Sequence, residues 1–433
     1  MPGERLGIRR LCDDLPMIGG NEVEALGRPI EVRGRPPRVT VVVYQLTDWG
    51  GAEGSTVLFL QRLARSEFQT RVLVLTGTCE FATRAELEAL GMEFIQVRSR
   101  WPGRARAVFA ELWRNPPDLV HSTLFFADLF ARLAAPLAGA PAMVSVVNMQ
   151  YAPEALAVAP SPRRLWLVRV TDRFLGRHLT SAFHALTAAT ARYATVELCA
   201  DPERTVVVGR GRELDRFLVD ESHGRAVRAE LGIAEGAPVL LNVARHEPQK
   251  GQNLLLDAFA ELRQTHPDAV LLVAGREGNT TPELLAQADE LGLGDSVRFL
   301  GLRGDVPELL SASTVFVSSA RYEGFGGAVL EAMAAARPVV AFDIPPVREV
   351  LGGTGVLVPL GDVAAMAGAI GTVLEDPDLA STMGAGGLAE AHRRYSAARS
   401  AVRLIDLYRD VITDAGRFRR PWVTRVGAKL RRR

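Results

Sequence analysis

Short apolar runs alternate with helical patterns along most of the chain. Residues 39–44 and 239–244 are mainly apolar runs of the kind that form strands buried on both faces of a parallel sheet. Each run leads through a loop into a stretch whose apolar residues recur with helical spacing. This repeated strand–helix order predicts an α/β fold, in which helices cover both faces of parallel sheets.

The alternation forms two series, and the sequence therefore predicts two Rossmann-like, doubly wound domains. The N-terminal domain is expected over residues 38–210 and the C-terminal domain over residues 236–395, since 433 residues exceed what one hydrophobic core organises. Ligands of such sheets bind beyond the carboxyl ends of the strands. Two domains that face each other would place these edges across a shared cleft.

The two ends of the chain depart from this pattern. Residues 1–37 show no clear period and are expected to form a poorly ordered leader. Residues 396–415 are expected to form a helix that crosses back to the N-terminal domain. Residues 416–433 are expected to form a basic tail.

Composition excludes several classes of function. The net charge is +1, so no global field draws the chain to nucleic acid. Cys12, Cys79 and Cys199 are far apart and suggest neither a disulfide framework nor a metal motif. No apolar run reaches the roughly 20 residues that span a bilayer, and no signal-peptide pattern opens the chain. We therefore expect a cytoplasmic protein without a metal or a cofactor.

The strongest chemical signal is the segment Glu-Gly-Phe-Gly-Gly-Ala-Val-Leu-Glu, which runs from Glu323 to Glu331. It follows an expected strand and leads into an expected helix. Gly324 and Gly326 allow backbone amides to approach a ligand, and the helix N-terminus suits a diphosphate. The two carboxylates can accept hydrogen bonds from sugar and ribose hydroxyls. The alternative is a flexible glycine turn with two solvated glutamates.

A second signal lies at the end of the first strand of the C-terminal series. Here Arg245 and Lys250 occupy a loop that should open toward the cleft. Lys250 is one of only two lysines in the chain, which favours a specific role. Both cations can neutralise a diphosphate and stabilise the charge on a departing one. Alternatively, the segment is a solvated loop with ordinary charges.

A third signal is Asp-Trp-Gly-Gly-Ala-Glu at residues 48–53, which joins the first strand of the N-terminal series to its helix. Gly50 and Gly51 suit a turn that cradles a phosphate. The segment is not a Walker loop, because no Gly-Lys-Ser/Thr follows, and it lacks the Gly-x-Gly-x-x-Gly spacing. Alone it is equally well explained as a plain glycine turn.

Together these motifs resemble the retaining GT-B glycosyltransferases that carry a Glu-x7-Glu motif, the group 1 and family 4-like enzymes. Four further segments contribute to the resemblance: residues 117–122, 211–217, 301–307 and 332–340. The resemblance extends from about Val39 to about Leu407. It implies a GT-B fold and retaining transfer of a sugar from a nucleotide-diphosphate sugar, UDP- or GDP-linked. The acceptor would be a hydroxyl of a glycan or a lipid-linked sugar, in cell-envelope glycan, glycolipid or polysaccharide synthesis.

The resemblance also implies roles for individual residues. In the N-terminal domain, Gly50 and Gly51 would face the donor phosphates. His121, at a strand end that faces the cleft, is the one histidine for which we expect a catalytic role. Family members often carry histidine where this chain has Thr123 and Asn148, so the donor sugar stays open.

In the C-terminal domain, the resemblance assigns Arg245 and Lys250 to the diphosphate, Glu323 to the sugar hydroxyls and Glu331 to the ribose. The remaining implied donor contacts come from backbone groups: those of Arg303 near the nucleobase, and those of Gly324, Phe325 and Gly326 near the sugar or phosphate.

No side chain is a convincing covalent nucleophile. Catalysis would therefore rest on orienting the substrates and on stabilising the departing diphosphate, which would itself receive the acceptor's proton. Arg210 and Arg212 replace the polar turn common in the family and add positive charge for a phosphate or an anionic acceptor. Two alternatives are a sugar-nucleotide epimerase of the same fold and a catalytically silent scaffold that binds a nucleotide sugar.

Two basic stretches suit an anionic membrane surface. Residues 163–177 place arginines along one face of an expected helix with an apolar body, and residues 417–433 hold eight basic residues. The alternatives are a solvated helix face, which we favour for residues 163–177, and a disordered tail.

Overall fold

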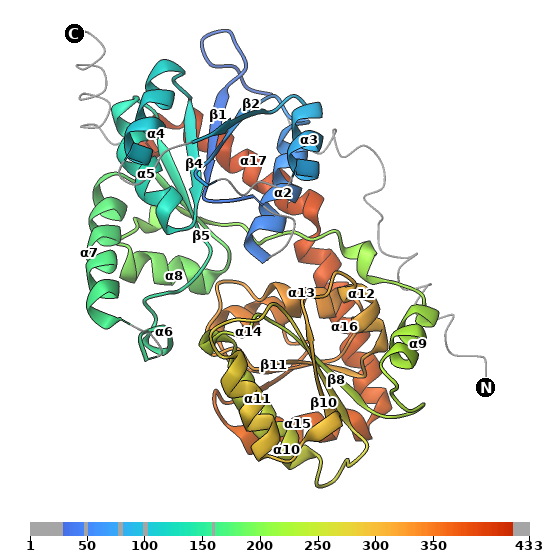
Figure 1. Ribbon diagram of the computed structural model, residues 1–433. Coiled ribbons are helices and arrows are strands. Elements are labelled where there is room, and N and C mark those ends of the chain that lie inside the picture. The colour runs from blue at the N-terminus through green and yellow to red at the C-terminus, as the bar shows by residue number, and fades with distance from the viewer. Residues whose placement is uncertain (1–28, 47–50, 77–80, 98–102, 158–160, 419–433) are drawn as a thin grey trace.

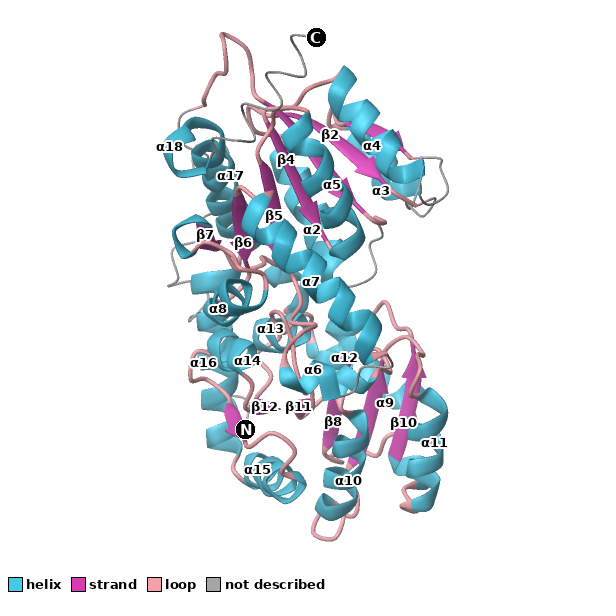
Figure 2. Cartoon of the chain, turned by 90° about the vertical axis from the view of Figure 1, so that its left-hand side faces the viewer, coloured by secondary structure: helices cyan, strands magenta, loops and turns pink. Residues whose placement is uncertain are grey.

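The computed structural model describes residues 29–46, 51–76, 81–97, 103–157 and 161–418 (Figure 1). Within these ranges the chain forms two parallel sheets, each with helices on both faces, as Figures 1 and 2 show. The α/β fold predicted from the alternating pattern is confirmed.

The first sheet has seven strands in the order β3-β2-β1-β4-β5-β6-β7. Their bounds are β1 Arg38–Val43, β2 Gln69–Val74, β3 Glu93–Gln96, β4 Leu119–Thr123, β5 Ala142–Val146, β6 Ala182–Ala185 and β7 Thr205–Val207. Within β1, Val41 and Val43 pack into one core while Val42 packs into another on the opposite face. Burial on both faces explains why this strand is an almost continuous apolar run.

The helices around the first sheet follow the strands in turn. They are α2 Gly51–Leu63, α3 Phe81–Ala89, α4 Gly103–Arg114, α5 Phe125–Leu137, α6 Pro153–Ala157, α7 Pro162–His178 and α8 Ala188–Glu197. The expected helix over residues 396–415 is present as α17, Ala397–Thr413, and it packs against α2. Its Ile405 and Tyr408 are fully buried in the same core as Val41.

The second sheet has six strands in the order β10-β9-β8-β11-β12-β13. Their bounds are β8 Val239–Val243, β9 Val270–Ala274, β10 Val297–Gly301, β11 Val315–Ser318, β12 Val339–Phe342 and β13 Val356–Val358. The helices of this half are α9 Glu221–Glu230, α10 Gln252–Leu262, α11 Thr281–Glu290, α12 Val306–Ala312, α13 Gly327–Ala334, α14 Pro345–Leu351, α15 Val363–Glu375 and α16 Pro377–Tyr395. After α17 the described chain ends in α18, Ala415–Phe418.

The chain passes between the two sheets twice, and the two crossings pair with each other. The Arg212 amide donates to Tyr395 O at 3.0 Å, and the Ala397 amide donates to Arg212 O at 2.9 Å. A β-carbon on Gly211 would lie 2.5 Å from Ala397 Cα, so only glycine fits this crossing. The crossings therefore form one fixed connection rather than two independent linkers.

The ends of the chain differ in part from expectation. Residues 29–37, which the sequence places in a poorly ordered leader, pack on the first sheet through Ile30 and Val32. The guanidinium of Arg35 donates two hydrogen bonds to the Asp118 carboxylate, at 2.8 and 3.1 Å. This bidentate contact explains why the segment packs on the sheet. Residues 1–28 and most of the predicted basic tail lie outside the described residues.

Candidate active site

The glycine loop after β11 begins a helix whose first amides have no side-chain cap. Gly326, with a φ of 97°, is the N-cap residue of α13, and no side chain of the described residues caps the helix. The left-handed backbone at Gly326 favours glycine. Amides left unsatisfied at a helix N-terminus, together with the helix dipole, form a site for an anion such as a phosphate.

The same loop touches the first sheet. A β-carbon on Gly324 would lie 2.1 Å from the carbonyl oxygen of Val147, directly after β5. The loops that follow β5 and β11 therefore meet at this point. Asn148, the next residue, is exposed beside the contact. The expectation that the carboxyl edges of both sheets face each other holds here.

Lys250 and Glu323 form an ion pair between two loops of the second sheet. Both side chains are less than a fifth exposed. Gly251 follows Lys250 with a φ of 60°, and a β-carbon there would lie 2.2 Å from Ser319 O. The Ser319 hydroxyl donates to Lys250 O at 2.8 Å. These contacts bind the loop after β8 to the loop after β11, so Lys250 and Glu323 have a fixed relative position.

Arg245 lies on the same β8 loop but is exposed and forms no ion pair with the described residues. Its positive charge acts on the Tyr322 hydroxyl, whose pKa is raised by burial and by Glu323. Arg245 is therefore close to the Glu323 loop and available to a ligand.

Arg212 connects both halves of the molecule at the base of the site. Its Nε donates to Glu331 Oε1 of α13 at 2.9 Å, and its Nη1 donates to the hydroxyl of Ser55 on α2. The Arg212 side chain is only 8% exposed. A β-carbon on Gly327 would lie 2.7 Å from Arg212 Nη2, which explains a second glycine at the start of α13. The sequence indicated a cation at this position but not that it would pair with Glu331.

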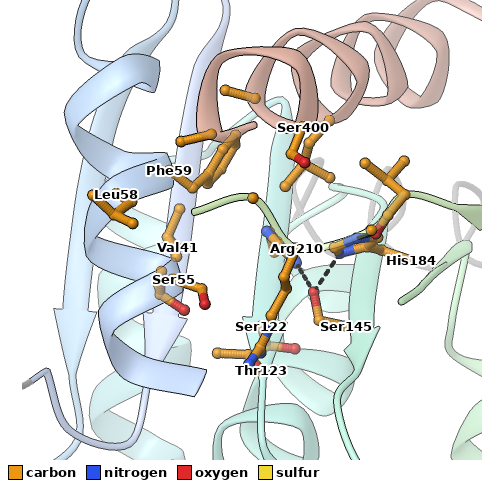
Figure 3. A pocket seen from close by; sticks show the side chains of 18 residues that line it. Val41, Ser55, Leu58, Phe59, Ser122, Thr123, Ser145, His184, Arg210 and Ser400 are labelled. Carbon is orange, nitrogen blue, oxygen red and sulfur yellow. Dashed lines mark hydrogen bonds between the residues drawn. The ribbon is translucent and has the colours of Figure 1, made fainter. Parts of the chain in front are cut away.

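Arg210 adds a second cation beside this pair. Burial and the neighbouring Arg212 lower the pKa of Arg210 to about 9, while Glu53 acts in the opposite direction. The guanidinium is therefore still charged at neutral pH. Figure 3 shows Arg210 in a pocket with Ser55, Thr123 and Ser400 among its lining residues.

His121 also lines this pocket, but its hydrogen-bond partners belong to the first sheet and to α17, which packs on that sheet. Its Nδ1 is 2.6 Å from the Tyr408 hydroxyl and its Nε2 is 2.7 Å from Ser145 Oγ. Ser145 Oγ is 2.7 Å from His184 Nδ1 (Figure 3). His184 Nε2 is 2.8 Å from Val208 O.

The direction of this hydrogen-bond chain follows from its end. The Val208 carbonyl can only accept, so His184 Nε2 donates and, in neutral His184, Nδ1 accepts from Ser145. Ser145 Oγ then accepts from His121 Nε2, and His121 Nδ1 accepts from the Tyr408 hydroxyl. Both imidazoles are neutral, because burial lowers the pKa of His121 well below its usual value and that of His184 to about 4.

The sequence-predicted residues fall into three groups. Lys250, Glu323 and the α13 start are brought together, and Arg245 lies near Tyr322 beside them. His121 occupies the buried chain with Tyr408, and no contact joins it to Lys250 or Glu323. Gly51 begins α2, whereas Gly50 lies outside the described residues.

Phe325 and Arg303, the two other residues predicted to contact the donor, use their side chains in contacts within the protein. Phe325 is 5% exposed and packs edge-on against Tyr395, with ring centroids 5.4 Å apart. Arg303 pairs with Glu230 at 2.9 Å and with Asp305 at 2.6 Å. Their backbone contacts to a donor remain predictions.

Two further properties limit the chemistry of the described part of the chain. No group of three His, Cys, Asp or Glu side chains in these ranges is arranged to hold a metal ion. Likewise, none of the described helices combines the length and apolarity needed to cross a membrane.

Each half of the chain matches a family model of known proteins. Residues 50–211 match the family model described as "Glycosyl transferase 4-like domain", and residues 225–388 match "Glycosyl transferases group 1". The chain is 32% identical over 322 residues to D-inositol 3-phosphate glycosyltransferase of Streptomyces scabiei, covering 70% of each chain. It is 30% identical to phosphatidyl-myo-inositol mannosyltransferase of Mycobacterium leprae, over 58% of this chain and 71% of that one.

Solved structures show the same arrangement of the two sheets. HepE of Anabaena, crystallised in complex with UDP and glucose, matches with a TM-score of 0.73 at 22% sequence identity. The match covers 86% of this chain and all of HepE. At this identity the likeness concerns the fold.

Proposed function

The chain belongs to the group 1 glycosyl transferases and has their GT-B fold, and on this premise we propose that it moves a sugar from a nucleotide-diphosphate sugar to an acceptor hydroxyl with retention. That it is a glycosyltransferase follows from the family. The donor class, the stereochemistry and the residue roles are the proposal.

One observation supports the proposal most strongly. Two carboxylate–cation pairs, Lys250–Glu323 and Arg212–Glu331, flank the uncapped N-terminus of α13. The helix start suits a diphosphate, and carboxylates on either side suit the hydroxyls of a sugar and a ribose. Glu331 uses Oε1 for Arg212, and its Oε2 makes no hydrogen bond with the described residues. HepE, a protein of the same fold, was crystallised with UDP and with UDP-glucose.

In the proposed reaction, the acceptor oxygen bonds to the anomeric carbon while the bond from that carbon to the diphosphate oxygen breaks. The acceptor's proton passes to the departing diphosphate. Lys250 and Arg245 stabilise the charge that develops there, which is the main contribution expected of a fixed cationic site. Glu323, held by Lys250, orients the sugar hydroxyls.

The acceptor is proposed to be a glycan or a lipid-linked sugar. Arg210 lies on the crossing that follows β7, in a pocket that α2, α17 and strands of the first sheet line. A cation that stays charged at neutral pH suits an acceptor that carries a phosphate. Two relatives are named for inositol phosphate and phosphatidylinositol acceptors, which supports this class.

The proposal is tested by titrating the protein with UDP-, GDP- and ADP-linked sugars while following its thermal unfolding. At least one nucleotide sugar should raise the unfolding temperature with saturation, because a ligand that binds the native state stabilises it. That sugar should then be transferred to a lipid or glycan extract, with its anomeric configuration retained on analysis of the product.

Two outcomes would contradict the proposal. If none of the nucleotide sugars raises the unfolding temperature, the proposed nucleotide-sugar site is wrong. Formation of an epimer from the donor alone, without an acceptor, would favour the epimerase alternative over transfer.

A further inference from the structure

Helix α7 presents a row of large apolar side chains to solvent. Trp166, Leu167 and Phe174 are 59–60% exposed and Val170 is 45% exposed. Their spacing along the helix places all four within one arc of its surface. Single exposed apolar residues are common on soluble proteins, but a contiguous group marks an interaction surface.

The opposite side of α7 is fixed to the molecule, so the apolar row cannot turn inward. Asp172 is buried, pairs with Arg132 of α5 and accepts a hydrogen bond from the Tyr151 hydroxyl. Gly176 lies against the chain after α8, where a β-carbon would come within 2.0 Å of Leu198 O. Figure 2 shows α7 on the side of the molecule that faces the viewer.

The exposed face of α7 is positively charged. Arg163, Arg164 and Arg177 are exposed, and the helix contains one acidic residue, the buried Asp172. Arg173 reaches α8 and donates to Val196 O at 2.8 Å. The Val196 side chain, 65% exposed, therefore extends the apolar surface beside the helix.

This arrangement changes the interpretation of residues 163–177. The sequence favours a solvated helix face over a membrane surface for this stretch. The structure instead shows the apolar side chains of α7 on the solvent side together with arginines.

We propose that the exposed face of α7, with Val196, inserts into the interfacial layer of a membrane that contains anionic phospholipid. Its aromatic and aliphatic side chains would enter the acyl boundary while Arg163, Arg164 and Arg177 contact headgroup phosphates. A second copy of this chain fits less well, because a two-fold contact would bring the same arginines of both copies together. This inference does not depend on the donor or the acceptor proposed above.

The test uses the full chain and sedimentation with vesicles of phosphatidylcholine alone or mixed with phosphatidylglycerol. The protein should bind the mixed vesicles, and binding should weaken with salt because the charge contribution is screened. The double variant Trp166→Ser/Phe174→Ser should bind at least about tenfold more weakly, since each large side chain loses its transfer from water. Arg163→Gln/Arg164→Gln should weaken binding at low salt and reduce its salt dependence.

The control variants replace exposed residues in the other half of the molecule. Leu285→Ser on α11 and Arg225→Gln on α9 should leave vesicle binding unchanged. Circular dichroism spectra and thermal unfolding temperatures that match those of the wild type show that the variants are folded.

Three results would overturn the proposal. One is equal binding of the wild type to vesicles with and without phosphatidylglycerol. A second is undiminished vesicle binding by the Trp166→Ser/Phe174→Ser variant, which would show that another segment of the chain contacts the membrane. The third is a dimer in sedimentation velocity that this variant abolishes, which would make the surface an interface between copies.

Discussion

At the scale of single residues, the site is defined by charges that occur in pairs. Each of the two predicted binding carboxylates has a cation against it, Lys250 for Glu323 and Arg212 for Glu331. A ligand that enters therefore meets side chains already oriented by their partners, which lowers the entropy cost of binding. The pairs also keep charged groups in a half-buried place where an unpaired charge would be unfavourable.

Arg212→Ala tests the link between the halves. The change removes the hydrogen bonds to Glu331 and Ser55, so we expect a loss of roughly 1–3 kcal/mol in unfolding free energy together with weaker donor binding. Urea unfolding and donor titration measure the two effects, with Arg225→Gln as the exposed control. If stability and affinity both stay at the wild-type level, Arg212 does not hold the site together.

The buried histidines predict a pH dependence of stability. The folded pKa of His184, about 4, lies below its unfolded value near 6.5. Between these values the unfolded chain binds a proton that the folded chain does not, so this contribution is present above pH 6.5 and is lost as the pH falls. Asp128, whose pKa burial raises to about 7, has the opposite effect, so the wild type must be compared with a variant.

We therefore predict that His184→Gln destabilises the protein at pH 7.5 and that the difference from the wild type shrinks at pH 5.5. The expected change is about 1.4 kcal/mol per pH unit below pH 6.5. Urea unfolding midpoints at the two pH values measure it. A difference that is constant, or that grows on acidification, would contradict a neutral His184.

At the scale of elements, close backbone approaches position the site. The glycine loop before α13 meets the loop after β5 at Gly324, and the β8 loop meets the β11 loop at Gly251. The helix start and the cations can act on one ligand only because these loops lie in contact.

Gly324→Ala should separate the loops after β5 and β11. Since the added carbon would lie 2.1 Å from the Val147 carbonyl oxygen, one of the two loops must move. We expect transfer activity to fall at least about tenfold, because a displacement of about 1 Å at a reacting centre has costs of that order or more. Gly368→Ala, on α15 with no atom within 4 Å of the added carbon, is the matched control. Full activity of Gly324→Ala would show that the loop contact is dispensable.

Sequence reasoning reached some of these elements and not others. The alternating apolar pattern was sufficient for the two sheets, and the glycine spacing was sufficient for the start of α13, because both are local signals. The pairing of Arg212 with Glu331 spans 119 residues, and the contact of His121 with Tyr408 spans 287 residues. Nothing local marks such pairs, so they appear only once the crossings of the chain are fixed. Arg35 shows the same limit, since its partner Asp118 lies on another segment.

At the scale of the whole molecule, the two halves are joined by the paired crossings and by a contact away from them. The Glu349 carboxylate of α14 accepts hydrogen bonds from the Ala188 amide at the start of α8, at 2.8 Å to each oxygen. This carboxylate lies at the positive end of a helix from the other half, which stabilises the arrangement seen here.

Glu349→Ala should favour separation of the two halves. Loss of this helix-end contact is expected to cost roughly 0.5–2 kcal/mol. Small-angle X-ray scattering should then give a larger radius of gyration than for the wild type, while Glu375→Ala, on the surface of α15, should not. An unchanged radius would show that other contacts alone keep the halves together.

The central claim is that a nucleotide diphosphate binds at the start of α13 beside Lys250. Calorimetric titration of UDP and GDP into the wild type, Lys250→Ala and the control Arg225→Gln tests it most directly. The account predicts that whichever nucleotide binds does so at least about tenfold more weakly to Lys250→Ala, since a charge-assisted contact is worth about 1.5–3 kcal/mol. Arg225→Gln should match the wild type. Equal affinity of Lys250→Ala and the wild type would contradict the account.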